Sequence, residues 1–333
     1  VHIITGFLKA IFDSGRIIDI AVHCGFSFIL AGSIFLTTRL LGIGIFAAVT
    51  AGCLANLYPE TASLNHMFML DFPAVAATAL GLFMLTYWWQ KQTVKTAIIA
   101  GIVIGFCCLT KQIVTAFLLG TGLFYTALVL FNQGEKPRKN LLIQLSLLVC
   151  TTLAVGLPWI LTNFHEMNSI NEYAKTNLDS KNMSMTKVEI FFYYLQSYWS
   201  NISPLLTLLL IASIGAMGLK KHKLLAPVWA SAIVGFALMC CYVYPLDRYI
   251  MPTLVATAIF SGVFLEQLIR SKFLGFKVLS GLLISLTLLQ YISFNFSPYP
   301  ISIKPLSDLS SRLGVKLRSS TFAKDSTKDN PTP

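Results

Sequence analysis

The sequence predicts an all-α protein that crosses the membrane many times. Of its 333 residues, 55% are hydrophobic and 12% are charged, which is more apolar surface than a soluble domain of this length can bury. Apolar runs of about 15 to 22 residues recur along the whole chain, and a bilayer core requires runs of about twenty. Because a chain in lipid satisfies its backbone hydrogen bonds internally, we expect these runs to be helices.

The apolar runs divide the chain into two membrane halves. We expect six helices in 17–162 and four in 204–293, joined by an outer segment at 163–203. Residues 1–16 are interpreted as the end of an outer loop at the interface, and 294–333 as a polar, largely disordered tail. The ten apolar segments are about 17–38, 42–57, 72–89, 96–110, 112–131, 141–162, 204–219, 225–243, 249–269 and 273–293.

The stretch 96–131 allows two interpretations, because Lys111 interrupts an otherwise apolar run. It forms either one long kinked helix or two shorter helices. With two helices, twelve basic residues and a single acid, Glu135, fall in the connections on one face. Cytoplasmic loops of membrane proteins are enriched in Lys and Arg. The charge distribution therefore favours two helices, with Lys111 at their outer turn.

The outer segment 163–203 is too long for a simple turn. Its second half, 188–199, is rich in aromatic residues and has few charges. Tyr and Trp rings prefer the boundary between lipid and water. We therefore expect a helix in this part of the segment, lying in the plane of the interface.

The net charge of +11 does not indicate a nucleic-acid partner, because the basic residues form short clusters between apolar runs. Such clusters mark the cytoplasmic ends of membrane helices and their contacts with membrane lipids. All seven cysteines lie inside apolar runs. They are expected to act as small buried hydrophobic residues rather than as disulfides or metal ligands.

The stretch 58–73 gathers polar residues between two apolar runs. It contains Glu60, Asn65, His66 and Asp71, in a chain with only 14 acidic residues. Glu60, Asn65 and His66 are candidates for binding the substrate in the same site as Asp71. Carboxylates kept near a membrane core usually face protein, water or a ligand. Asp71 is suited to binding a divalent cation such as Mg²⁺ or Mn²⁺, orienting a cation, or accepting a hydrogen bond from a sugar. The alternative is structural: Asp71 caps a helix that has Pro73 in its first turn.

Two basic residues are candidates for binding an anion on the outer face. Lys111 is a lone cation at a helix turn and suits a phosphate, although a snorkelling lysine has the same sequence signature. Arg248 follows Asp247, and it either pairs with that acid or presents its guanidinium to a phosphate. Tyr249 is assigned to the same binding region. The sequence contains no Gly-rich nucleotide loop, so a transfer reaction on this face needs a preactivated donor in the membrane.

These residues resemble a known family, the polytopic C-type glycosyltransferases of the protein-mannosyltransferase-like and aminoarabinose-transferase-like group. No single motif carries the resemblance; their order over about residues 15–265 does. The matching pieces are Arg39-Leu-Leu-Gly42, Tyr58-Pro59, Leu70-Asp71-Phe-Pro73, Gly101-Ile-Val-Ile-Gly105 with Leu109-Thr-Lys111, Leu157-Pro-Trp159 and Asp247-Arg-Tyr-Ile-Met-Pro252.

The resemblance implies a transferase in the plasma membrane of a bacterium, with its site on the outer face. The donor would be a sugar on a polyprenyl phosphate, and the acceptor a protein, lipid or glycan. Asp71 matches the second acidic position of the family's site, and Lys111 and Arg248 match basic positions near the lipid phosphate. The main catalytic acid of the family lies in the first outer loop. We expect it upstream of Val1, because neither Asp13 nor Asp19 matches it.

A polytopic lipid-linked-saccharide flippase or small-molecule transporter is the alternative function. Such proteins place ionisable or Pro/Gly-broken sites near the middle of the membrane. In this sequence the ionisable residues crowd the ends of the apolar runs, and only Glu266 lies close to an inner end. This distribution favours the transferase.

Overall fold

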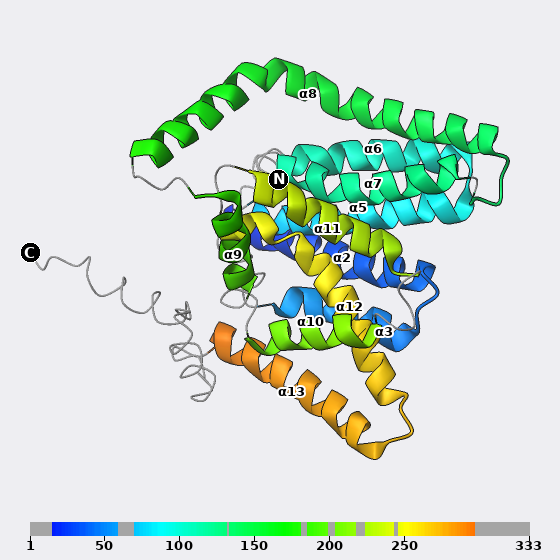
Figure 1. Cartoon of the computed structure of the whole chain (residues 1–333), viewed down its shortest axis with the longest axis vertical. Helices are drawn as coiled ribbons and strands as arrows, with labels where there is room; N and C mark the ends of the chain where they lie inside the picture. The colour runs from blue at the N-terminus through cyan, green and yellow to red at the C-terminus, as the bar shows by residue number, and fades with distance from the viewer. Residues whose placement is uncertain are drawn as a thin grey trace, which may run out of the picture.

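The computed structural model describes residues 15–58, 70–131, 133–180, 185–198, 204–217, 224–242 and 246–296. Within these ranges the regular structure is entirely helical (Figure 1). The helices are α2 (Gly15–Leu40), α3 (Ile45–Leu57), α5 (Asp71–Lys91), α6 (Val94–Thr110), α7 (Gln112–Leu130), α8 (Arg138–Ser180), α9 (Lys187–Ser197), α10 (Pro204–Met217), α11 (Ala226–Cys241), the short 3₁₀ helix η2 (Asp247–Ile250), α12 (Thr253–Ile269) and α13 (Leu274–Phe296).

The all-α class is confirmed, and each of the ten apolar segments coincides with one helix. In the described part of the chain, five helices are long and apolar enough to cross a membrane: Ile20–Leu40, Asp71–Lys91, Gln112–Leu130, Arg138–Asn163 and Leu274–Ile292. The other five apolar helices are shorter, between 10 and 17 residues. Ten as the number of membrane crossings stays a prediction.

Lys111 separates two helices, as the charge distribution predicted. It is the single residue between α6 and α7, and its backbone is extended, with φ −164° and ψ 138°. Figure 1 shows α6 and α7 side by side, and the two helices contact each other. An extended residue between two helices reverses the chain without continuing either hydrogen-bond ladder. The turn therefore presents Lys111 at one end of the bundle.

The helix α8 is longer than the sequence indicated. It runs for 43 residues to Ser180, so the first part of the segment at 163–203 continues the membrane helix. Pro158 lies near its middle, where Figure 1 shows a bend. Proline lacks the backbone N–H that would bond one turn back, which permits a kink without ending the helix. Hydropathy marks only the apolar half of such a helix.

The predicted aromatic helix is present as α9. Its first turn is closed by a capping box, in which Thr186 accepts a hydrogen bond from the Glu189 backbone and Glu189 accepts one from the Thr186 backbone. Figure 1 shows α9 running across the ends of the longer helices. Its position in the lipid–water interface stays a prediction. Of the segments interpreted as an outer loop (1–16) and a polar tail (294–333), residues 15–16 belong to α2 and residues 294–296 to α13. The rest of both segments lies outside the described residues.

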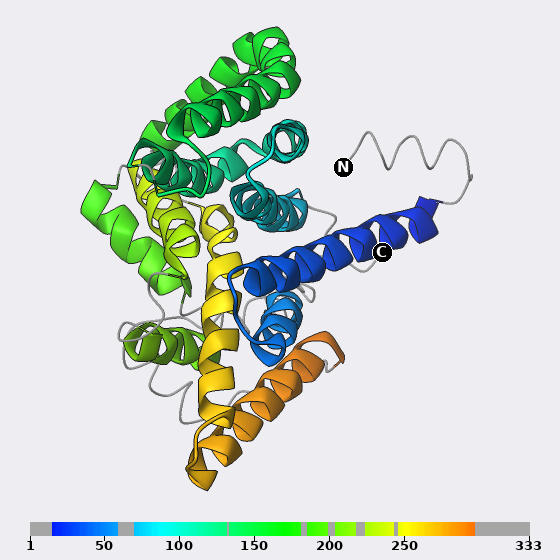
Figure 2. The same ribbon diagram turned by 90° about the vertical axis from the view of Figure 1, so that its right-hand side faces the viewer.

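The helix α5 lies at the centre of the fold and joins its two apolar clusters. One cluster groups α5 with α2, α3, α10, α12 and the start of α11, and the other groups it with α6, α7, α8, α9 and the end of α11. Figures 1 and 2 show α8 and α13 at opposite edges of this bundle. In the second cluster, Gly101 and Gly105 let α6 approach α8 so closely that any added Cβ would overlap Thr151 or Val155. Small residues at such contacts are typical of membrane helices.

Candidate functional site

Asp71 begins the most buried of the long helices. It is the first residue of α5, and its side chain is 4% exposed. The interpretation of Asp71 as the N-cap is wrong, because the N-cap position is taken by Leu70 and makes no side-chain cap bond. A carboxylate in the first turn still interacts favourably with the positive end of the helix dipole. Its oxygens point toward basic side chains of other elements, so its role extends beyond α5.

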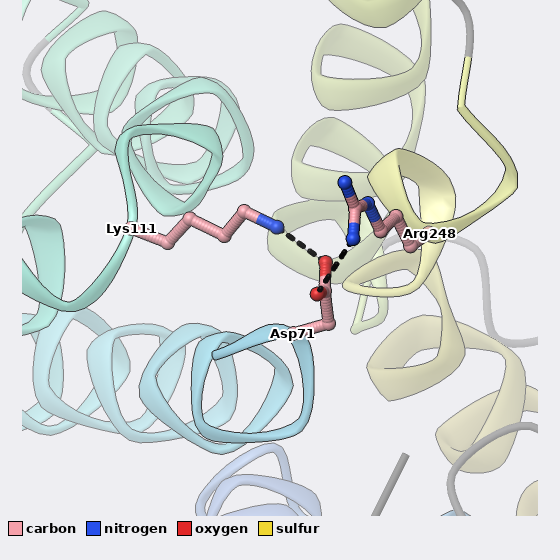
Figure 3. Close-up of polar contacts among 3 residues, drawn as sticks. All are labelled: Asp71, Lys111 and Arg248. Carbon is pink, nitrogen blue, oxygen red and sulfur yellow. Dashed lines mark hydrogen bonds and ion pairs between the residues drawn. The ribbon is translucent and has the colours of Figure 1, made fainter. Parts of the chain in front are cut away.

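Two basic residues from distant parts of the chain meet at this carboxylate (Figure 3). Lys111 Nζ donates a hydrogen bond to Asp71 Oδ1 and forms an ion pair with it. Arg248 Nη1 lies 4.0 Å from Asp71 Oδ2. Lys111 comes from the α6–α7 turn and Arg248 from η2, so three separate elements build the cluster. The structure thus brings together three of the residues predicted from the sequence.

Exposure in this cluster rises in steps. The side chain of Asp71 is 4% exposed, that of Lys111 22% and that of Arg248 43%. A lysine ammonium has three N–H donors and an arginine guanidinium has five. Each cation faces a single oxygen of Asp71, so both have more donors than that oxygen uses. A molecule entering from solvent therefore meets cationic donors first and the carboxylate last. Among the side chains of this cluster that the structure describes, two cations and one carboxylate leave one net positive charge, which favours an anion.

Tyr249 lines the same region, as expected. Lys111 Nζ lies 5.4 Å from the centroid of the Tyr249 ring, within the range of a cation–π contact. The Tyr249 ring also packs edge-on against Tyr242, with centroids 5.6 Å apart. The ring gives the ammonium a contact that does not depend on Asp71.

The structure adds two residues that sequence reasoning missed, Tyr198 and Thr253. The Tyr198 hydroxyl donates a hydrogen bond to Thr253 Oγ1, and Thr253 Oγ1 donates one to the Ile250 carbonyl oxygen at 2.5 Å. Burial raises the pKa of the Tyr198 phenol, so it remains a donor at neutral pH. These bonds tie α9 to the end of η2, the turn that carries Arg248. The available signal was the stripe Thr253, Thr257 and Ser261, spaced by four residues along the apolar helix α12.

Glu60, Asn65 and His66 lie outside the described residues, so their predicted place beside Asp71 is not tested. In the part of the chain that is described, no three His, Cys, Asp or Glu side chains form a group able to hold a metal ion. Asp71 supplies one carboxylate flanked by two cations, a donor set that suits an anion better than a divalent cation. Metal binding at Asp71 stays a prediction.

A second buried carboxylate, Glu266, lies in the last turn of α12. It is 3% exposed and forms an ion pair with Arg270, one helical turn later, at 2.5 Å. A Cβ added to Gly44 would overlap the Glu266 carboxylate, so this group lies at the start of α3. Arg270 is 70% exposed. The pairing is local to one helix and to its contact with α3.

Comparisons with known proteins give one informative match. No family model and no curated protein sequence matches this chain. Among solved structures, the fold is similar to that in the crystal structure of ArnT from Cupriavidus metallidurans bound to undecaprenyl phosphate, with a TM-score of 0.54 and 16% identity. The match covers 96% of this chain and 62% of that chain. The resemblance to the aminoarabinose-transferase-like group is thus confirmed at the level of the polytopic membrane fold.

Proposed function

We propose that this chain belongs to a membrane glycosyltransferase that moves a sugar from a polyprenyl-phosphate donor to an acceptor on the outer face. The observation that carries the proposal is the convergence of Lys111 and Arg248, from two distant elements, on one partly exposed anion-binding cluster. The similar structure, ArnT, was solved with undecaprenyl phosphate bound. That ligand is a lipid phosphate of the class this cluster suits.

In the proposed reaction, negative charge develops on the departing phosphate. The bond between the sugar anomeric carbon and the phosphate oxygen breaks, and its electron pair leaves with the polyprenyl phosphate. A bond forms between the anomeric carbon and the acceptor, whose proton passes to a base. Cations fixed beside the departing phosphate stabilise the negative charge that develops there. Lys111 and Arg248 are the groups of this chain that we assign to this role.

Asp71 positions these two cations. Both of its oxygens face basic groups, so we do not assign it as the base that accepts the acceptor's proton. The contribution of Asp71 is to hold Lys111 and Arg248 near one place before the lipid phosphate enters and after it leaves.

Turnover in detergent tests the proposal and separates it from transport. The complete gene product, purified in detergent, is mixed with polyprenyl-phosphate sugar labelled in the sugar, together with cell extract as the source of acceptors. Transfer moves the label into an acceptor, whereas a flippase has no sealed membrane across which to act. The control is Lys111→Gln/Arg248→Gln, which removes both cations. Label that stays on the donor with wild-type protein and every extract fraction contradicts the proposal.

The outer location of the site can be tested by labelling. Lys187, at the start of α9, and Lys272, between α12 and α13, are both exposed and are predicted to lie on opposite sides of the membrane. Single cysteines at these positions, in a chain lacking the seven native ones, should differ in reaction with an impermeant maleimide on intact cells. Cysteine at 187 should react and cysteine at 272 should not. Equal reaction would contradict the predicted topology.

A further inference from the structure

The anion that already occupies the cluster is Asp71 itself. It is the least exposed of the three side chains and holds Lys111 through a direct ion pair, whereas Arg248 is held only loosely, at 4.0 Å. An entering phosphate therefore meets a guanidinium that is 43% exposed and lies 4.0 Å from Asp71, and an ammonium that Asp71 already pairs. Any phosphate that recruits Lys111 has to compete with Asp71.

The proposed donor and product differ in the charge of that phosphate. The donor is a phosphodiester with one negative charge, and the product is a phosphomonoester with a charge of about −1.5 to −2 at neutral pH. The single net positive charge of the cluster balances the one negative charge of the donor phosphate, but it is smaller than the negative charge of the product phosphate. A site without Asp71 would carry two positive charges and would hold the product more tightly than the donor. Tight product binding slows every turnover after the first.

We propose that Asp71 competes with the lipid phosphate for the Lys111 ammonium. Lys111 pairs with the phosphate as the second negative charge develops there, and it returns to Asp71 when the product leaves. This assignment rests on the proposed function, and it makes Asp71 the residue that sets the preference between phosphodiester and phosphomonoester lipids. The Tyr249 ring, 5.4 Å from Lys111 Nζ, gives the ammonium a contact during the exchange. Arg248 holds the phosphate throughout.

The test compares two lipids that differ only in charge. A polyprenyl phosphate and its methyl diester are titrated into detergent-solubilised protein at about pH 8, where the monoester, with a second pKa near 6, carries its full charge. The uncharged polyprenol is the blank. In Asp71→Asn, affinity for the monoester should rise at least about tenfold, equivalent to about 1.4 kcal/mol, while affinity for the diester changes less than about threefold.

Glu266→Gln is the matched control, because it neutralises a carboxylate that is equally buried and paired with arginine at the other end of α12. It should leave the ratio of the two affinities within about twofold of wild type. If Asp71→Asn raises the affinity for both lipids equally, or lowers the affinity for the monoester, Asp71 is not a competitor and the assignment is overturned.

A second variant keeps the proposal testable if Asp71→Asn does not fold. Lys111→Gln should lower the affinity for the monoester at least about tenfold more than the affinity for the diester, because only the monoester recruits Lys111 fully. In the double variant, Asp71→Asn should no longer strengthen monoester binding, since the two residues act through one contact. Equal losses for the two lipids in Lys111→Gln overturn the proposal.

The proposed function and the role of Asp71 as competitor are rejected by different results. If wild-type protein binds neither charged lipid more tightly than polyprenol, the proposed function is wrong. If it binds both lipids but the variants shift them together, the proposed function stands and only the role of Asp71 as competitor is rejected.

Discussion

Two buried carboxylates lie at opposite ends of α12, and their surroundings differ. Asp71 lies beside η2, which precedes the helix, and Glu266 lies in its last turn. Both are almost fully buried and both pair with basic residues. Asp71 draws its partners from two distant elements that remain partly open to solvent, whereas Glu266 pairs with Arg270 of its own helix and packs against Gly44.

The difference separates a binding cluster from a packing contact. A carboxylate that lies against a neighbouring helix and pairs one turn away leaves little room for a ligand. A carboxylate that gathers cations from separate elements concentrates positive charge at one point, and the protein accepts the cost of desolvating them. Burial of a charged group is therefore weak evidence of function by itself. The origin and exposure of its partners discriminate between the two cases.

The largest contrast is expected in turnover. Asp71→Asn in the complete gene product should lower the multiple-turnover rate about tenfold to a hundredfold, because the product, bound at least about tenfold more tightly, leaves more slowly. If release of the product is the affected step, a rapid-quench experiment should show a burst of one turnover followed by the slow rate. Glu266→Gln should stay within about twofold of wild type. Equal losses in the two variants would remove the distinction between the carboxylates.

Donor affinity should respond next. Arg248→Gln removes a charge-assisted contact of about 1.5–3 kcal/mol, so donor binding should weaken about tenfold to a hundredfold. Lys111→Gln should weaken donor binding less, because the diester does not recruit Lys111 fully. Acceptor affinity should not change. Arg270→Gln, which removes the basic partner of Glu266, is the matched control and should leave donor affinity unaltered. Loss of acceptor affinity with donor affinity intact would contradict the assignment.

Much of this arrangement was predictable because its signals are local. The lengths of the apolar runs indicated each helix, and the basic clusters indicated the break at Lys111. The polar residues left at helix ends included Asp71, Lys111 and Arg248. The sequence did not show that Lys111 and Arg248 meet on Asp71, because α5, α6 and α7 are apolar on most of their surface. Such helices carry little amphipathic signal about which faces are in contact.

Two further features were missed for similar reasons. The second half of α8 is polar, so hydropathy ended the helix near residue 162 although the structure continues it to Ser180. The bond from Tyr198 to Thr253 joins residues that are 55 positions apart. A threonine in a membrane helix often bonds to its own backbone, so the stripe on α12 did not indicate a partner on α9.

A substitution beside Glu266 should lower the stability of the protein without affecting donor binding at the Asp71 cluster. In Gly44→Ala the new methyl group meets the Glu266 carboxylate, and overpacking of this kind costs about 1–3 kcal/mol. The midpoint of thermal unfolding in detergent should fall, with donor affinity unchanged. Glu266→Ala in the same chain makes room for the methyl group and should recover part of the loss. A drop in donor affinity in Gly44→Ala would show that the two ends of α12 are coupled.

The smallest expected effect concerns the attachment of η2. Tyr198→Phe removes the hydroxyl that donates to Thr253 Oγ1, while Thr253 still donates to the Ile250 carbonyl oxygen. Loss of one neutral hydrogen bond is worth about 1 kcal/mol, or about fivefold in an equilibrium constant. Because this bond restrains the turn that carries Arg248, we expect KM for the donor to rise about threefold to fivefold and kcat to change less.

Arg39→Gln is the control at the other end of the molecule, where the Arg39 guanidinium donates to the Ile43 carbonyl oxygen at 2.8 Å. It removes a side-chain bond to a turn that carries no donor-binding residue, and it should leave KM unchanged. If Tyr198→Phe lowers only the unfolding midpoint, the bond supports the fold without positioning Arg248. A raised KM with the midpoint preserved would place Tyr198 among the residues that position the lipid phosphate.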